Sequence, residues 1–126
     1  VALEHKSSFK LYEIVDVQIK IDDNNYIIHG LSGVFYLDNM EQCFKKQKEV
    51  SSQLSKVFKN VKKIGPYTKI HKADPTGESK YIDISYSFKS GLAVVTCYDF
   101  SDSLKDTAAD FFSTSLRTAE LNDWLL

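Results

Sequence analysis

Residues 38–58 read DNMEQCFKKQKEVSSQLSKVF and carry a strongly periodic pattern. Mainly apolar side chains recur there in steps of three and four, which is the spacing of one face of an α-helix. Asp38 stands where an N-cap belongs, and Glu41 follows three positions later, as in a capping box. The pattern predicts one long amphipathic helix near the middle of the chain. Its buried stripe would consist of Met40, Cys43, Gln47, Val50, Leu54 and Val57, widened by Phe44 and Phe58.

The residues before this helix predict a β-hairpin. Apolar and polar side chains alternate over residues 15–21, as they do in a half-buried strand. Residues 22–25 form the strongest turn cluster of the chain, and residues 26–36 are rich in strand-forming side chains. Gly30 and Gly33 lie inside this second strand, so we expect it to bend or bulge at a glycine. Residues 1–8 are expected to be a loose lead-in.

The residues after the helix predict more antiparallel strands. Residues 61–72 are expected to form an edge strand that Gly65–Pro66 interrupts, followed by a loop over residues 73–79. Residues 82–88 and 92–100 then predict a second hairpin. Residues 111–117 fit either a strand or a helix, and we favour a short strand. A helical turn over residues 120–125 would follow and would dock Trp124.

These elements together predict a two-layer α+β domain. Its mainly antiparallel sheet would have about five strands, with the long amphipathic helix packed on one face and a short C-terminal helix. The 126 residues fit a single domain, residues 1–126, and 43% hydrophobic residues supply a core. The helix stripe would contact the following sheet residues: Val15, Val17, Ile19, Ile84, Tyr86 and Val95.

Charge is distributed unevenly along the chain. Residues 45–72 hold nine lysines and one acid, Glu49, whereas the whole chain has a net charge of −1. This segment favours a solvated outer helix face, with an anion-binding face as the alternative. An acidic protein is favoured over nucleic acid, because the chain has a single arginine, the side chain best suited to bidentate phosphate contacts. The candidate residues are Lys45, Lys46, Lys48, Lys56, Lys59, Lys62 and Lys63.

The two cysteines pose a question of register. Cys43 lies on the helix stripe, and a two-residue turn at Ser90–Gly91 would pair Ile84 with Cys97 and turn Cys97 toward the helix. A three-residue turn would place Cys97 on the opposite face, because side chains alternate along a strand. A disulfide between Cys43 and Cys97 and a pair of buried free thiols therefore both remain open.

Histidines and tyrosines give the remaining candidate residues. His29 lies in a predicted strand beside a glycine and is a candidate for a cleft together with Tyr86. Tyr26, Tyr36, Tyr86 and Tyr98 could line a pocket between a curved sheet and the helix. The sequence shows no catalytic motif, no metal-ligand spacing and no phosphate loop, so no catalytic residue, metal or cofactor is predicted.

Three functions are compatible with these patterns. The first is a small non-catalytic binding or interaction domain of unknown partner. A disulfide would place that domain in an oxidising compartment, which favours an exported protein, periplasmic or secreted. The second is a small-ligand carrier or enzyme with a pocket between sheet and helix. The third is a structural or oligomerising module joined through an exposed strand. The sequence contains no run of eighteen apolar residues, so no membrane span is predicted.

Overall fold

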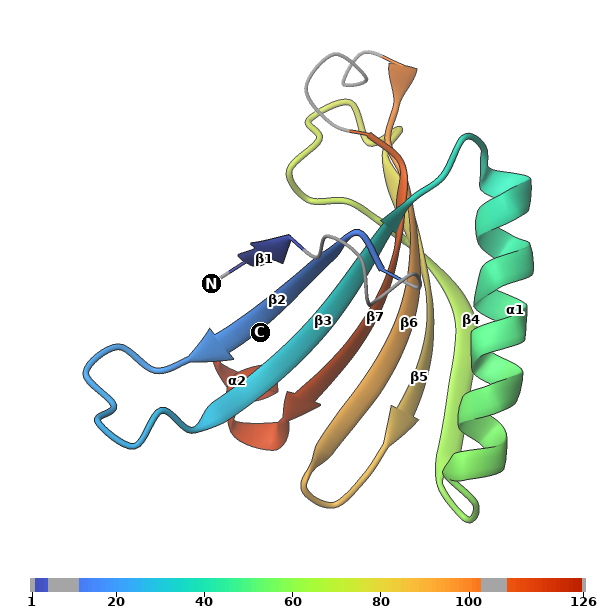
Figure 1. Cartoon of the computed structure of the whole chain (residues 1–126). Coiled ribbons are helices and arrows are strands. Elements are labelled where there is room, and N and C mark those ends of the chain that lie inside the picture. The colour runs from blue at the N-terminus through green and yellow to red at the C-terminus, as the bar shows by residue number, and fades with distance from the viewer. Residues whose placement is uncertain (1, 5–11, 103–108, 126) are drawn as a thin grey trace.

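The computed structural model of the chain describes residues 2–4, 12–102 and 109–125, with only the backbone for residues 2–4, 124 and 125. Its elements follow one another along the chain as Figure 1 labels them. They are β1 (Ala2–Glu4), β2 (Ile14–Ile19), β3 (Ile28–Tyr36), α1 (Met40–Val57), β4 (Lys62–Ile70), β5 (Lys80–Ser87), β6 (Gly91–Asp99), β7 (Phe111–Thr118) and α2 (Ala119–Leu125).

The strands form one antiparallel sheet in the order β1-β2-β3-β7-β6-β5-β4. The predicted α+β class, with one long helix and a short C-terminal helix, is confirmed. The sheet has seven strands rather than about five. One reason is that residues 2–4 of the predicted loose lead-in pair with β2 as strand β1.

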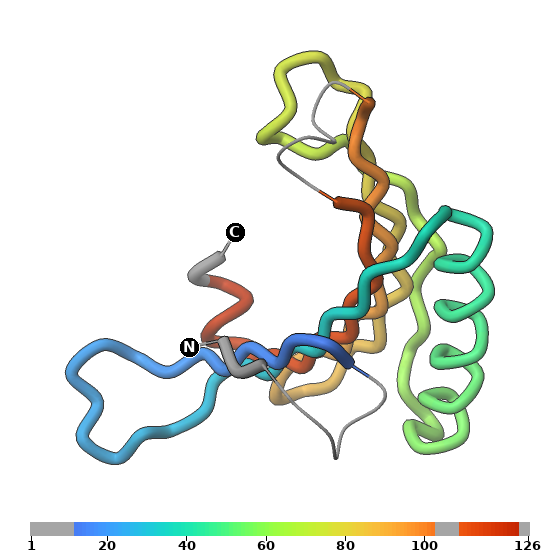
Figure 2. The backbone as a smooth tube through the Cα atoms, turned by 45° about the horizontal axis from the view of Figure 1, so that its top comes forward, coloured from blue at the N-terminus to red at the C-terminus, as the bar shows by residue number. Residues whose placement is uncertain are grey.

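The two helices lie on opposite faces of a bent sheet. Figure 2 shows α1 on the outside of the bend and α2 inside it. We call the sheet face under α1 the outer face and the opposite one the inner face. α1 contacts β6 and β7, whereas α2 contacts β3, β6 and β7. The middle of the sheet is therefore covered from both sides.

The core lies between α1 and the outer face. One buried cluster consists of Cys43, Val95, Cys97 and Phe112, and a second consists of Ile84, Tyr86 and Ala93. Leu54 packs against both clusters, as its place on the helix stripe predicts. The core is thus built from one face of α1 and the outer face of the sheet.

Two parts of the predicted helix contact are wrong. Val57, the last residue of α1, is 72% exposed and Phe44 is 45% exposed, while Ser51 is buried. Val15, Val17 and Ile19 belong to β2, which the strand order separates from β6 by β3 and β7. The helix instead covers β6 and β7, because β7 pairs with β3 and displaces β2 from the centre.

The helix N-terminus is capped one residue later than predicted. Asn39, not Asp38, is the N-cap, and its Oδ1 accepts a hydrogen bond of 2.9 Å from the Gln42 N–H. Gln42 Oε1 in turn accepts the Asp38 N–H at 3.4 Å. The capping pair predicted for Asp38 and Glu41 is therefore replaced by Asn39 and Gln42, a spacing that also fits a capping box.

The hairpin of β5 and β6 has neither predicted turn. Cys97 pairs with Ile82 rather than Ile84, and Tyr86 pairs with Ala93. The turn lies one residue earlier than predicted and is closed by the Phe88 N–H, which donates to the Gly91 C=O at 2.8 Å. The shift from the two-residue register equals two positions, so Cys97 keeps the predicted face.

The other predicted elements occur near their expected places. β2 and β3 form the first hairpin, and the ladder slips between Gln18 and Ile19, opposite the segment that contains Gly30. Residues 111–117 belong to strand β7, and α2 follows it. The predicted docking of Trp124 concerns a side chain outside the described part of the chain.

Candidate functional site

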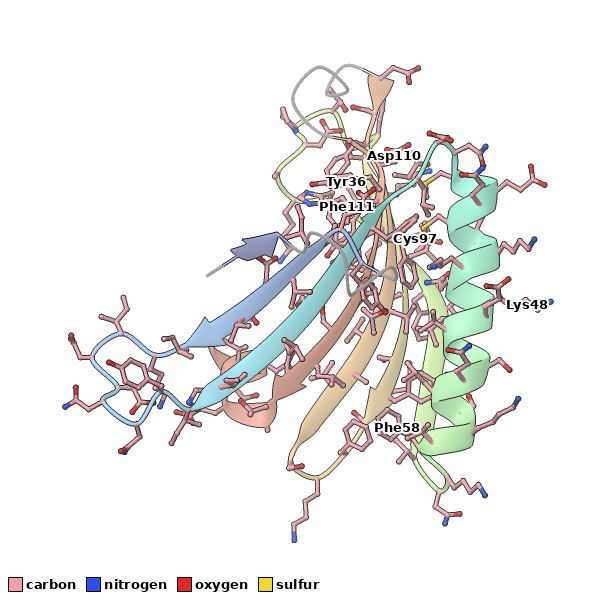
Figure 3. The ribbon with its side chains drawn as sticks, in the orientation of Figure 1. Tyr36, Lys48, Phe58, Cys97, Asp110 and Phe111 are labelled. Carbon is pink, nitrogen blue, oxygen red and sulfur yellow. A yellow bond between two sulfur atoms is a disulfide. The ribbon has the colours of Figure 1, made fainter. Side chains whose placement is uncertain are left out.

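A disulfide joins Cys43 of α1 to Cys97 of β6. The two Cα atoms are 6.0 Å apart, and both residues are at most 1% exposed. Figure 3 shows this bond between the helix and the sheet near the labelled Cys97. The bond fixes α1 covalently to the outer face, and with it every residue that the helix carries.

Tyr86, one of the two predicted cleft residues, lies inside the helix–sheet interface. It is 1% exposed, and its hydroxyl donates to the Ser51 C=O at 2.8 Å. The same oxygen lies 2.6 Å from Ser51 Oγ and 3.0 Å from Ser55 Oγ. These contacts occupy the space between sheet and helix, where the small-ligand hypothesis places its pocket.

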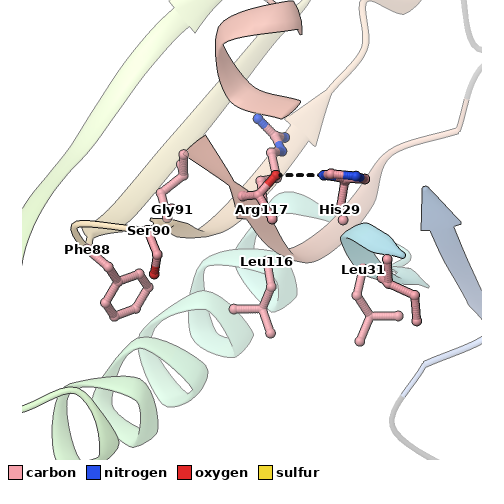
Figure 4. A pocket seen from close by; sticks show the side chains of 11 residues that line it. His29, Leu31, Phe88, Ser90, Gly91, Leu116 and Arg117 are labelled. Atoms are coloured by element: carbon pink, nitrogen blue, oxygen red, sulfur yellow. Dashed lines mark hydrogen bonds between the residues drawn. The ribbon is translucent and has the colours of Figure 1, made fainter. Parts of the chain in front are cut away.

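His29, the other predicted cleft residue, lines two pockets near the β2–β3 hairpin. The first, of about 380 Å³, lies beside β3, β6 and β7 and includes the apolar side chains of Leu31, Phe88 and Leu116. Figure 4 shows His29 at its rim, with Nδ1 3.4 Å from Thr118 Oγ1. The structure therefore places His29 and Tyr86 in different environments and does not bring them together.

The second pocket, of about 550 Å³, lies between β2 and the start of α2. Lys20 and Glu120 form an ion pair at its wall, and this hydrogen bond lowers the pKa of the Glu120 carboxyl. His29 Nδ1 lies 3.8 Å from Glu120 Oε2. The charged side chains of this pocket therefore contact one another, and these contacts connect α2 to the first hairpin.

The predicted lysines lie mostly on one exposed surface. Lys45, Lys48 and Lys56 are exposed on α1, and Figure 3 shows Lys48 pointing away from the sheet. Figures 1 and 2 both place β4 alongside α1, so Lys63, which pairs with the buried Tyr86, continues this surface. We call it the lysine face, made of Lys45, Lys48, Lys56, Lys59 and Lys63, all of them exposed. Lys62 is exposed too, but it pairs with Ser87 and so lies on the inner face.

Lys46, although it is carried by α1, also lies apart from this face. Its Nζ lies 4.7 Å from the centre of the Phe35 ring on β3, which is the geometry of a cation–π contact. Lys46 therefore points toward the middle of the sheet, whereas β4 forms the far edge. Lys45, Lys46 and Lys48 are close in sequence and point in different directions only because they lie on a helix. The run of lysines therefore does not show by itself that Lys46 points toward the sheet.

The charge of the lysine face is not compensated within the described residues. The ion pairs found there are Lys20–Glu120, His29–Glu120 and Lys69–Asp83, and none includes a lysine of the face. Glu49 is the one acid between residues 45 and 72. Unpaired lysines at close range repel one another, and an acidic ligand would relieve that repulsion.

A second feature, a row of aromatic rings across the inner face, was not predicted. Tyr36, Phe111, Tyr98 and Tyr81 are successive partners across β3, β7, β6 and β5. The rings of Tyr98 and Phe111 stack with centres 4.3 Å apart, and those of Tyr81 and Tyr98 with centres 5.8 Å apart. Tyr36, at the end of this aromatic row, is 43% exposed.

Charged groups border the aromatic row on the side of β4. Lys69 lies 3.6 Å from Asp83, which also accepts a hydrogen bond of 2.7 Å from the Thr96 hydroxyl. Burial raises the pKa of the Tyr98 hydroxyl, and the negative charge of Asp83 acts in the same direction. Tyr36 and Tyr98 were both in the predicted tyrosine set, whereas Tyr26 is 72% exposed in the β2–β3 loop.

Hydrogen bonds to Asp74 hold the loop after β4 in shape. Asp74 is 5% exposed and accepts hydrogen bonds from the backbone N–H groups of Thr76 and Ser79, each at 2.9 Å. Hydrogen bonds from the Ser79 and Thr76 hydroxyls add to these and hold the pKa of the Asp74 carboxyl well below its usual range. His71, which precedes this loop, packs edge-on against Tyr98.

No family model, no curated protein and no solved structure matches this chain. The fold defines it as an α+β domain with one antiparallel sheet. Over residues 2–4, 12–102 and 109–125, no helix has the length and apolar character needed to cross a membrane. In the same residues, no three or more His, Cys, Asp or Glu side chains gather in a way that would hold a metal ion.

Proposed function

We propose that this chain is a small non-catalytic binding domain that binds an acidic protein through its lysine face. The observation that carries the proposal is the set of exposed lysines on α1 and β4 that form no ion pair within the described residues. Each lysine supplies a point charge on a flexible stem, which attracts carboxylates. Such a surface binds by charge complementarity and involves no bond-making step.

An acidic protein fits this surface better than nucleic acid does. Arginine is the residue of choice for bidentate contacts with phosphates, and the single Arg117 lies on β7 rather than on the lysine face. No aromatic side chain of the inner row belongs to the lysine face, so bases would find no stacking platform there. The disulfide supports an exported protein, because such bonds persist in oxidising compartments.

Binding to polyglutamate at low and high salt tests the proposal. We expect binding at low ionic strength that weakens steeply as salt is added, because the charges are exposed and screened. Lys56→Glu should weaken binding about two- to tenfold, since exposed charge pairs contribute about 0.2–1 kcal/mol each and the reversal adds repulsion. Lys89→Glu makes the same charge change in the β5–β6 turn and is the matched control. No binding at low salt, or equal losses in both variants, would refute the proposal.

The aromatic row supports a second candidate function, the binding of a small ligand on the inner face. Partly exposed aromatic rings provide large, rigid apolar contacts, and the neighbouring, partly exposed Asp83 offers a polar one. Screening small ring compounds by NMR would test this function through signals of Tyr98 and Phe111. A hit should be weakened by Tyr36→Ala and unaffected by Tyr26→Ala; compounds that shift no signal of the row would exclude it.

A further inference from the structure

Strand β4 forms an open edge of the sheet next to the lysine face. Among the residues that the structure describes, it is the last strand of the order and pairs only with β5. It spans nine residues, of which seven are exposed, including Tyr67 at 58% and Ile70 at 61%. An edge strand presents alternate N–H and C=O groups that its single neighbour leaves unpaired. β4 therefore offers a ladder for another extended chain.

We infer that the acidic partner binds as an extended segment that adds an eighth strand to the sheet beside β4. This inference rests on the proposed function, because it takes the partner to be an acidic protein. In strand addition, backbone hydrogen bonds supply affinity and alternating side chains supply specificity. The lysine face would then recognise the side chains of the added strand.

Lysines stand on both sides of this edge. Lys62 and Lys69 pair with Ser87 and Tyr81, so they lie on the inner face. Lys63 pairs with the buried Tyr86 and therefore lies on the outer face, where α1 carries its own lysines. An added strand would meet positive charge on each face. We therefore expect the added strand to carry acidic side chains on both of its faces.

Apolar side chains lie beside these lysines on both faces. Tyr67 pairs with Asp83 on the inner face, and Ile70 pairs with Lys80 on the outer face. Both are more than half exposed, so an apolar residue of the partner would remove water from each. The partner segment should therefore combine acidic residues opposite the lysines with apolar residues opposite Tyr67 and Ile70.

The edge is better suited to an acidic partner than to a second copy of this chain. Two β4 strands side by side would bring lysines close to lysines, and like charges across strands are destabilising. Edge lysines commonly prevent such self-pairing. The ladder with β5 also slips between Ile64 and Tyr67, and Pro66 has no N–H to donate. Residues 67–70 are therefore where an added strand should pair first.

The test uses a short capped peptide of Glu-Glu-Val-Val repeats, which places glutamate and valine in turn on both faces of an added strand. The control peptide has the same sequence but carries N-methyl groups on alternate amides, which keeps its charge and removes backbone donors. We expect the first peptide to slow hydrogen exchange of the residue 67–70 amides about tenfold or more. The N-methylated peptide should bind about tenfold more weakly, because several hydrogen bonds are lost. Lys63→Glu should weaken binding, and Lys89→Glu should not.

The outcomes separate the two proposals. Equal binding of both peptides, or protection at β1 instead of β4, would overturn strand addition and leave the lysine face as a simple charged surface. No binding of either peptide or of polyglutamate at low salt would refute the proposed function itself. The choice of an acidic protein would be overturned if a single-stranded oligonucleotide bound more tightly than polyglutamate of equal charge.

Discussion

The side-chain amide of Gln47 joins α1 to two neighbouring strands. Its Nε2 donates hydrogen bonds to the Ile82 C=O at 2.8 Å and to the Val95 C=O at 2.9 Å. Gln47 is 4% exposed and lies in the apolar stripe of the helix. A buried amide needs its partners, so Gln47 sets where α1 sits along the sheet.

Substitution of Gln47 should therefore destabilise the fold. Gln47→Leu keeps the volume but leaves two carbonyl groups without this donor, and should lower the free energy of unfolding by about 1–3 kcal/mol. Gln47→Ala should cost more, because it also leaves a cavity. Denaturant unfolding measures both, with the exposed Gln53→Ala as control. A Gln47→Leu protein as stable as the wild type would show that these bonds add nothing net.

One packed and one exposed residue of the predicted helix stripe give a matched pair of variants. Leu54 packs against both core clusters, so Leu54→Ala should lower the free energy of unfolding by about 2–5 kcal/mol. Val57 is 72% exposed, so Val57→Ala should stay within about 0.5 kcal/mol of the wild type. Urea titrations of both proteins test the prediction. Similar losses in the two variants would contradict the helix face described above.

Loss of the disulfide should lower stability by about 3–4 kcal/mol, because the bond closes a loop of 54 residues in the unfolded chain. The variant Cys43→Ser/Cys97→Ser isolates this effect in guanidinium unfolding. Reductant should destabilise the wild type by a similar amount and leave the double variant unchanged. Alkylation of the denatured protein checks the bond directly, since two adducts should appear only after reduction. Adducts without reduction would mean free thiols.

Acid should loosen the loop that contains Asp74. Its carboxyl has a lower pKa in the folded protein than in the unfolded chain, where the usual value is about 3.9. The stability it contributes is complete above that value and is lost as the pH falls further. Asp74→Asn should flatten the dependence of the thermal midpoint on pH below about 4. Asp22→Asn, in an exposed turn, is the control, and equal slopes in wild type and Asp74→Asn would refute this role.

Local patterns were sufficient to predict most elements of this fold. The spacing of Cys43, Gln47 and Leu54 identified the helix, and alternation identified the strands of both hairpins. Turn geometry was less visible, because several loop lengths fit the residues between Phe88 and Leu92. The predicted face of Cys97 was right only because the true register differs by an even number of positions.

Long-range pairing could not be predicted in this way. β3 pairs with β7, so Tyr36 lies opposite Phe111, a residue 75 positions later in the sequence. The aromatic row depends on this pairing, so it could not be predicted from the sequence. The lysine-rich segment was found because it is continuous along the chain. That part of it forms an open sheet edge follows only from the strand order.

The disulfide also divides the molecule mechanically. The chain between Cys43 and Cys97 contains most of α1, all of β4 and β5 and most of β6. In the sheet order these strands lie together on one side, with β1, β2, β3 and β7 on the other. When the two chain ends are pulled apart, tension bypasses the closed segment, and only the other half can lengthen. The lysine face and the β4 edge would thus keep their shape under a load that unravels the rest.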